Sequence, residues 1–274
     1  MWPTILSLDA PVVAVLWQRL MARSSSVGIG APEMFVLGCS VWLAYAADRW
    51  IEAWRLSPER IRTHRHDFYR KRRWPIAVVW VAVLGLDLGA AFGGLSPLEL
   101  RAGAIMLLPV AAYLFSHQLL HRNVRWRLPK EVCIGMLLGG GAVLFPACHS
   151  APDVRKMAIP LALFVLLCFS NCALISVWER EVDRSHGQTS LAIQFGPAAA
   201  FSRALPWALA VLCAAVWIAA DPRARPAAAC AAFSSVLLGV VGLVGARIGR
   251  ALARVLADLA LVTPLIPLLV RVIP

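Results

Sequence analysis

The chain has 274 residues, of which 60% are hydrophobic and only 15% are charged, and its mean hydropathy is +0.71. Because a soluble globular domain carries about 25% charged residues, this composition argues against a soluble protein. The net charge of +12 would suit a nucleic-acid partner. However, the basic residues lie between long apolar segments, as Lys and Arg do in the cytoplasmic connections of membrane proteins. We therefore expect a membrane protein that binds no nucleic acid.

Apolar segments long enough to cross a bilayer as helices follow one another along the whole chain. Their predicted ranges are about 8–24, 30–49, 74–94, 98–118, 131–149, 157–178, 198–220, 226–246 and 252–272. The connections between them are short. We therefore expect one transmembrane domain over residues 1–274, an all-α polytopic bundle of about nine spans.

Prolines and polar residues modify this pattern. Several segments have a proline at or near their start, where a missing N–H is tolerated: Pro32, Pro75, Pro129 and Pro226. Pro264 and Pro267 fall inside the last segment, where we expect a kink. Asp9, Gln18 and Arg19 interrupt the first segment, so we expect it to tilt or to face the protein interior.

The basic residues gather in alternate connections. Of the 27 Lys and Arg residues, 19 lie in or beside the second-to-third, fourth-to-fifth, sixth-to-seventh and eighth-to-ninth connections. The positive-inside rule makes these connections cytosolic. We therefore expect an integral protein of the cytoplasmic (inner) membrane with a cytosolic N-terminus. Because the N-terminal segment has no basic stretch followed by a cleavage site, we expect no removable signal.

The longest connection, residues 50–73, combines aromatic residues with many Arg and His residues. Such a segment can lie on anionic lipid headgroups, or it can cap a site for an anionic ligand. The two interpretations are compatible.

Acidic pairs end the second and sixth segments on the expected cytosolic side. Asp48 and Glu52 are four residues apart, as are Glu179 and Asp183, so each pair lies on one helical face, whereas Glu181 points elsewhere. One such pair at a membrane interface would usually bind a neighbouring Arg. Two pairs on one side, each beside a basic segment, instead favour Mg²⁺ ions that bind a diphosphate, because Mg²⁺ takes carboxylate, phosphate and water oxygens.

These motifs resemble those of the UbiA superfamily of intramembrane prenyltransferases. The sequence DRWIE at 48–52 resembles the second half of the first family motif, with Glu in place of the final Asp. Glu179 and Asp183 take the acidic positions of the second motif, whose downstream spacing is kept by Gly187, Ser190 and Gly196. The basic connection and Gly-containing segment at 121–141 are also similar to the family pattern, so the resemblance spans most of the chain at low identity.

The chain departs from the family motifs at four positions. Ala44 and Tyr45 replace the Asn-Asp that opens the first motif, Ile175 replaces an acid before Glu179, and Thr189 replaces a Lys. Four carboxylates remain where the fullest motifs have more. The acceptor therefore need not be the aromatic acid that some members of the family use.

The resemblance implies Mg²⁺-dependent transfer of an isoprenyl group from a prenyl diphosphate to a small or lipid acceptor. It assigns both metal binding and catalysis to Asp48, Glu52, Glu179 and Asp183. The apolar bundle would hold the isoprenoid tail and exclude water, while metal and fixed cations stabilise the leaving diphosphate. The residues expected to contact substrate are Tyr45, Arg49, Arg65, Arg125, Arg127, Lys130, Asn171 and Ser176.

Two other functions stay open. One is a catalytically inactive UbiA-like protein that binds a lipid, a polyprenyl phosphate or a protein partner, as the missing Asn-Asp suggests. The other is a small transporter, which the absence of an internal hydropathy repeat disfavours.

Other ionisable residues lie within the apolar segments. Asp87 and Asp258 are expected away from the site, either in interhelical hydrogen bonds or in acceptor binding. His117 and His121 are four residues apart, but without a third ligand an interface role is favoured over a metal.

Overall fold

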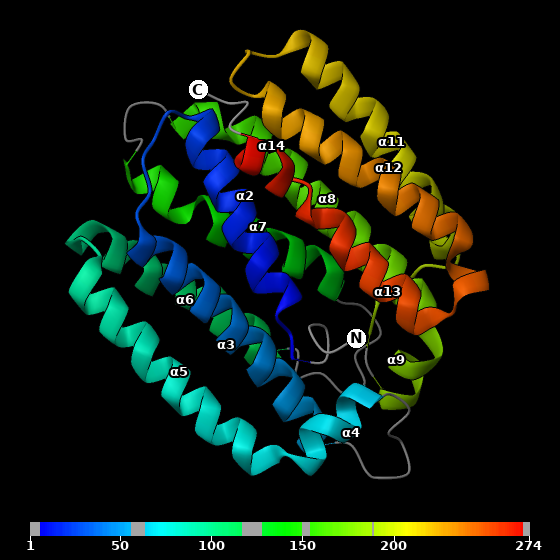
Figure 1. Cartoon of the computed structure of the whole chain (residues 1–274). Helices are drawn as coiled ribbons and strands as arrows, with labels where there is room; N and C mark the ends of the chain where they lie inside the picture. The colour runs from blue at the N-terminus through cyan, green and yellow to red at the C-terminus, as the bar shows by residue number, and fades with distance from the viewer. Residues whose placement is uncertain (1–5, 56–63, 117–127, 150–153, 188, 271–274) are drawn as a thin grey trace.

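The structure, a computed structural model, describes residues 6–55, 64–116, 128–149, 154–187 and 189–270, and the regular secondary structure of these residues is helical (Figure 1). The longer helices are α2 (Asp9–Ser24), α3 (Ala31–Arg55), α5 (Arg73–Gly94), α6 (Pro97–Phe115), α7 (Lys130–His149), α8 (Ala158–Trp178), α11 (Ala198–Ala219), α12 (Arg225–Ile248) and α13 (Arg250–Leu259). The shorter elements are α4 (His64–Lys71), α9 (Arg180–His186), α10 (Leu191–Gln194), α14 (Leu265–Val270) and the 3₁₀ helices η3 (Val154–Met157) and η4 (Ala260–Val262).

Within the described residues, six helices are long and apolar enough to cross a membrane: α5, α6, α7, α8, α11 and α12. The chain is an integral membrane protein, but this criterion does not reproduce the expected nine spans. The difference has a physical reason in each case. Helix α2 has only 16 residues, α3 carries charged residues at both ends, and α13 ends after 10 residues.

Helix α2 lies near the middle of the bundle, where it contacts α3, α7, α12 and α13 (Figure 1). Around it, α5 packs on α3, α6 on α7, α7 on α8, and α8 on α11 and α12. The C-terminal end of α3 lies at the same end of the bundle as α4 and α9 (Figure 1). That end carries the site described below.

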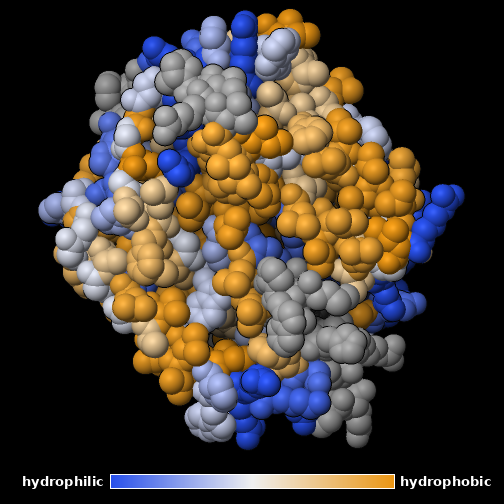
Figure 2. Space-filling view, in the orientation of Figure 1, coloured by the Kyte–Doolittle hydropathy of each residue, from blue (hydrophilic) through white to orange (hydrophobic). Residues whose placement is uncertain are grey.

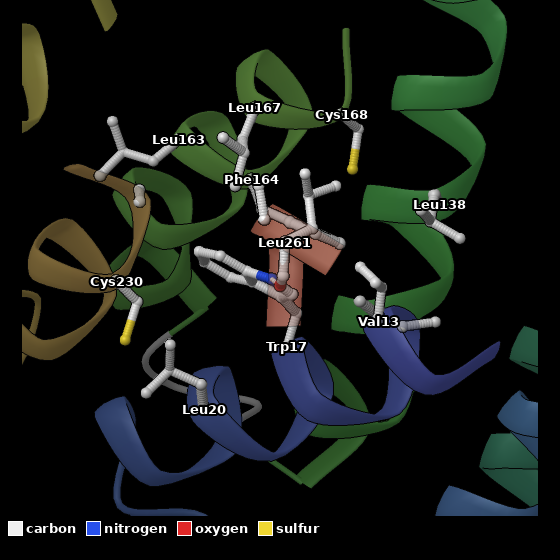
Figure 3. Packing of buried hydrophobic residues seen from close by; sticks show 14 of the residues in the cluster. Val13, Trp17, Leu20, Leu138, Leu163, Phe164, Leu167, Cys168, Cys230 and Leu261 are labelled. Atoms are coloured by element: carbon white, nitrogen blue, oxygen red, sulfur yellow. Dashed lines mark hydrogen bonds between the residues drawn. The ribbon is translucent and has the colours of Figure 1, made fainter. Parts of the chain in front are cut away.

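The centre of the core is formed by Trp17 of α2 (Figure 3). Its ring stacks on Phe164 of α8 with a centroid distance of 4.6 Å, and its Nε1 donates to the Leu261 carbonyl at 2.9 Å. Trp17, Gln18 and Leu20 are fully buried. Of the two alternatives expected for the first segment, tilting or facing the interior, the structure therefore shows the second.

The last predicted segment is broken, as its prolines predicted. Helix α13 ends at Leu259, η4 follows, and α14 begins at Leu265, because Pro264 has no N–H to continue the helix. The Thr263 Oγ1 donates to the Cys230 carbonyl at 3.0 Å and lies 2.7 Å from Ser234 Oγ. Such neighbouring hydrogen bonds stabilise irregular backbone inside a membrane.

Large apolar side chains are exposed along the outer helices, especially α5, α6 and α11. Figure 2 shows hydrophobic residues over most of the visible face, with hydrophilic residues mainly toward the ends of the helices. An exposed apolar surface of this extent would favour aggregation in water, and it suits contact with lipid.

Candidate functional site

A cavity opens where the C-terminal ends of α3 and α8 meet α9, the N-terminal end of α7 and one face of α13. Its charged lining residues lie on these parts of the helices, except for Asp9, which lies in the first turn of α2. One to three turns further into the bundle, the lining becomes apolar, with Val13, Leu138, Cys168 and Leu261. The cavity therefore joins a charged mouth to an apolar interior.

All four carboxylates of the predicted acidic pairs line this cavity. Helix α3 supplies Asp48 and Glu52 from adjacent turns. The junction of α8 and α9 supplies Glu179 and Asp183, and the Asp183 N–H donates to the Glu179 carbonyl at 2.9 Å, which continues the turn through the junction. The side chain of Glu181 is 77% exposed, as expected for a residue on another face.

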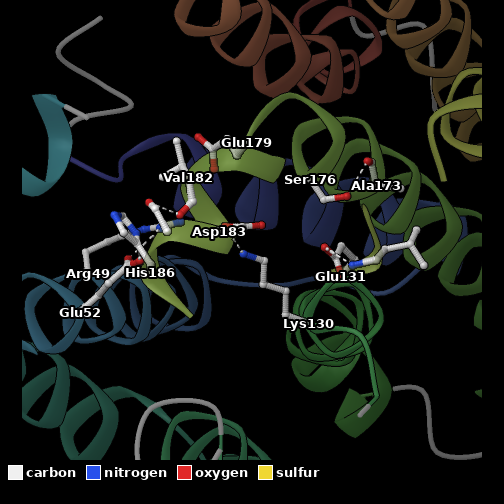
Figure 4. Close-up of polar contacts among 12 residues, drawn as sticks. Arg49, Glu52, Lys130, Glu131, Ala173, Ser176, Glu179, Val182, Asp183 and His186 are labelled. Carbon is white, nitrogen blue, oxygen red and sulfur yellow. Dashed lines mark hydrogen bonds and ion pairs between the residues drawn. The ribbon is translucent and has the colours of Figure 1, made fainter. Parts of the chain in front are cut away.

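Cationic side chains from three helices contact three of these carboxylates, Glu52, Glu179 and Asp183. Lys130 Nζ, at the start of α7, lies 3.0 Å from Asp183 Oδ1 (Figure 4). Arg254 of α13 forms an ion pair with Glu179, and Arg49 lies 3.5 Å from Glu52. The carboxylates are thus held by fixed cations that could also contact an anionic ligand.

Several residues of the cavity were not predicted from the sequence: Glu131, His186 and Arg254. His186 Nδ1 lies 3.6 Å from Glu52 Oε1, so it bridges the two acidic motifs (Figure 4). Glu131 Oε1 accepts a hydrogen bond from the Leu191 N–H at 3.1 Å. His186 follows Asp183 by three residues on the same helix. This spacing could have indicated that His186 lies on the same face as Asp183 and therefore in the site.

Asp258 also lines the cavity, so the expectation that it lies away from the site is wrong. Helix α13 begins at the cavity end of the bundle, and Asp258 follows Arg254 by one turn. Its Oδ2 lies 4.0 Å from Arg254 Nε. Asp87, in contrast, accepts a hydrogen bond from Ser40 Oγ at 2.9 Å, which joins α5 to α3.

Of the other residues predicted to contact substrate, some line the cavity and some are not described by the structure. Tyr45, Asn171 and Ser176 line the cavity. Asn171 Nδ2 donates to Asp258 Oδ1 at 3.0 Å, whereas Ser176 Oγ donates to the Ala173 carbonyl of its own helix at 2.8 Å (Figure 4). Arg125 and Arg127, which were predicted to contact substrate, lie outside the described residues, as do His117 and His121. Arg65 belongs to α4, but the structure describes only its backbone.

The lining has a large excess of acidic groups. Seven carboxylates face three Lys or Arg side chains and one histidine among the described residues. In addition, Asp183 Oδ2 and Glu131 Oε2 are buried without a hydrogen-bond partner in the described part of the chain. Buried oxygens of this kind require a partner, and a divalent cation would fit both the charge and the hard oxygen ligands.

Together, the fold and the cavity define a helical integral membrane protein with a charged site at one end of its bundle. No protein-family model matches the chain, and no curated protein sequence matches it. Solved structures do match. A UbiA homologue from Aeropyrum pernix K1 superimposes with a TM-score of 0.67 at 16% identity, over 96% of this chain and 98% of that one.

Two further structures agree with this match. A UbiA homologue from Archaeoglobus fulgidus bound to DMAPP and Mg²⁺ has a TM-score of 0.58 at 13% identity, over 95% of this chain and 97% of that one. A digeranylgeranylglyceryl phosphate synthase has a TM-score of 0.51 at 14% identity, over 96% of both chains. The chain therefore has the UbiA fold.

Proposed function

We propose that this chain is a UbiA-superfamily prenyltransferase that moves an isoprenyl group from a prenyl diphosphate to a small or lipid acceptor. The observation that carries the proposal is that two acidic pairs, from α3 and from the α8–α9 junction, line one cavity with an apolar interior. The A. fulgidus homologue, which has the same fold, is bound to DMAPP and Mg²⁺.

The donor set of the cavity fits Mg²⁺. Asp48, Glu52, Glu179 and Asp183 would hold the metal, and the buried Asp183 Oδ2 has no other hydrogen-bond partner among the described residues. When bound, Mg²⁺ supplies positive charge that stabilises the leaving diphosphate. The excess of carboxylates over cations in the lining supports a divalent ion rather than a bare anion at this site.

The chain's own cations and apolar residues would serve the substrate. Lys130, Arg49 and Arg254 would contact diphosphate oxygens, while Leu138 and Leu261 would pack on the isoprenyl tail and keep water away. In the transfer, the allylic C–O bond breaks and its electron pair leaves with the diphosphate. The allylic carbon then bonds to a nucleophilic atom of the acceptor, which loses a proton.

The proposed function also requires a particular orientation of the protein in the membrane. We place the cavity end of the bundle, with its basic connections, on the cytosolic side of the cytoplasmic membrane, together with the N-terminus. A charged, water-soluble diphosphate group would then reach the carboxylates from the cytosol, while its apolar tail enters the bundle.

The proposal is tested with Asp48→Asn and Glu179→Gln, assayed with Mg²⁺, a panel of prenyl diphosphates and a membrane lipid extract. Product mass and diphosphate release are measured. We expect turnover to fall by at least about 100-fold in both variants, because removal of a ligand is more severe than the roughly 10–100-fold effect of an outer-shell change. Glu181→Gln, which removes an exposed acid next to the site, is the matched control and keeps full activity.

Folding of each variant is checked by gel-filtration profile and thermal unfolding. If both cavity variants retain wild-type turnover, the prenyltransferase proposal is wrong.

The motif departures favour a second candidate, an inactive protein that binds a prenyl or polyprenyl phosphate. Tyr45 and Ile175 line the cavity at positions where the fuller family motifs carry acids. In that case, the wild-type protein would bind Mg²⁺ and a prenyl diphosphate, with affinity lowered in Asp48→Asn, but it would release no diphosphate. Equilibrium binding measured beside turnover separates the two candidates.

A further inference from the structure

A second cluster of ligating side chains lies at the other end of the bundle from the cavity. Glu33 stands in the first turn of α3, Glu99 in the first turn of α6, and His149 at the last position of α7. Along α3, Glu33 precedes Asp48 by 15 residues, which corresponds to about 22 Å of helix. The cluster is therefore separate from the proposed prenyl-transfer site.

The two carboxylates of this cluster are oriented alike. Glu33 Oε2 accepts a hydrogen bond from the Gly30 N–H at 3.1 Å. Glu99 Oε2 accepts from the N–H and the Oγ of Ser96 at 2.8 and 2.7 Å. Each glutamate thus uses one oxygen to cap its own helix, and this fixes the direction of the other oxygen.

The second oxygens converge on the imidazole of His149. Its Nε2 lies 2.9 Å from Glu99 Oε1 and 3.4 Å from Glu33 Oε1. The three ligand atoms all lie within 4.8 Å of one another. Three ligand atoms gathered around one point can form the protein part of a metal coordination shell, which water would complete.

Charge and burial favour a cation at this point. Glu33 and Glu99 are only 8% and 3% exposed, so their negative charges are poorly solvated. One imidazole, neutral or protonated, cannot balance two carboxylates. A divalent cation would balance them, whereas His149 alone leaves at least one negative charge in excess.

We infer that Glu33, Glu99 and His149 form a binding site for a divalent transition-metal ion, with Zn²⁺ as its representative. A mixed set of one imidazole and two carboxylates suits Zn²⁺ and its neighbours, whereas Mg²⁺ and Ca²⁺ prefer oxygen ligands throughout. The ion would join the ends of α3, α6 and α7. This link matters most for α6, because few of the residues of this helix are buried inside the bundle.

The test uses the full chain, purified in detergent and stripped of metal with a chelator. Zn²⁺ binding is measured by competition with a chromophoric chelator, and Co²⁺ is added separately to record its visible absorption. With excess Mg²⁺ present to occupy the cavity, the wild-type protein is expected to bind one Zn²⁺ with a raised Tm and to give a Co²⁺ spectrum of low coordination number. His149→Ala and Glu99→Gln are expected to lose on the order of 100-fold in Zn²⁺ affinity or more.

These variants are chosen to preserve the fold. The His149 side chain is 40% exposed, so its truncation opens no core cavity, and Gln at position 99 can still accept the Ser96 hydrogen bonds. Two controls locate the ion: His117→Ala/His121→Ala removes another histidine pair, and Asp48→Asn removes a carboxylate of the cavity. Both are expected to bind Zn²⁺ at this site as the wild type does.

Two outcomes would overturn the inference. In the first, the wild-type protein takes up no Zn²⁺. In the second, folded His149→Ala and Glu99→Gln both bind Zn²⁺ as tightly as the wild type. The three residues would then be an ion pair between helix ends. Neither outcome bears on prenyl transfer, which is assayed at the opposite end of the bundle.

Discussion

At the scale of single residues, Lys130 has a double role in the proposed site. Its Nζ holds Asp183 Oδ1 at 3.0 Å and lies in the cavity where the diphosphate would bind. A hydrogen bond to a charged group contributes about 1.5–3 kcal/mol, or roughly 10- to 100-fold in a rate constant. We therefore expect Lys130→Met to lower kcat/KM for the prenyl diphosphate by about that factor.

Steady-state diphosphate release measures this effect, and Lys130→Arg is expected to recover part of it because the positive charge returns. Lys156→Met, which changes an exposed lysine in η3, controls for loss of surface charge. An unchanged kcat/KM in Lys130→Met would show that Lys130 contributes neither to diphosphate binding nor to the positioning of Asp183.

Each acidic pair could be predicted from the sequence because the relation within the pair is local. The pair Asp48 and Glu52 lies on one helix, so the spacing of four residues was enough to place both on one face. Arg254 could not be predicted in this way, because it meets Glu179 across 75 residues of sequence. That contact depends on how α13 packs at the end of the bundle, and local periodicity carries no information on it.

At the scale of elements, hydropathy located most helices to within a few residues, as α8 at Ala158–Trp178 illustrates. Hydropathy could not show how the last segment is divided, although its prolines indicated a break. It also could not show that α2 is a buried central helix, because polar residues such as Gln18 lower hydropathy whether they face water or the core. Only packing distinguishes those two cases.

The contact between α7 and α8 depends on glycine. A Cβ at Gly139 would overlap the side chain of Val165 and lie 3.2 Å from Leu161 Cδ1, and a Cβ at Gly135 would lie 3.1 Å from the Val165 carbonyl oxygen. Overpacking of this kind costs about 1–3 kcal/mol. We therefore expect Gly139→Ala to lower the Tm by several degrees, as followed by thermal unfolding in detergent.

Gly89→Ala is the matched control for this packing, because a Cβ at Gly89 meets no heavy atom within 4 Å. Alanine also has a higher helix propensity than glycine by about 1 kcal/mol, so this variant is expected to keep or raise the Tm. An equal Tm in Gly139→Ala and Gly89→Ala would mean that α7 and α8 separate easily at this point.

At the scale of the whole molecule, the two ends of the bundle differ in chemistry. The cavity end combines carboxylates with Lys130, Arg49 and Arg254, whereas the opposite end holds the cluster of Glu33, Glu99 and His149. A prenyl diphosphate made in the cytosol can serve this protein only if the cavity end faces the cytosol. The proposed function therefore requires a cytosolic cavity end, which is also the orientation that the basic connections predict.

This orientation can be measured by labelling single introduced cysteines with a membrane-impermeant maleimide in intact bacterial cells. Arg223→Cys lies in the exposed connection between α11 and α12, and Glu181→Cys lies beside the cavity at the other end of the bundle. We expect Arg223→Cys to be labelled in intact cells and Glu181→Cys only after the membrane is permeabilised, because the positive-inside rule places the cavity end in the cytosol. The unsubstituted chain, with its seven native cysteines, sets the background. The reverse labelling pattern would place the carboxylates outside the cell, and a cytosolic prenyl diphosphate could then not be the donor.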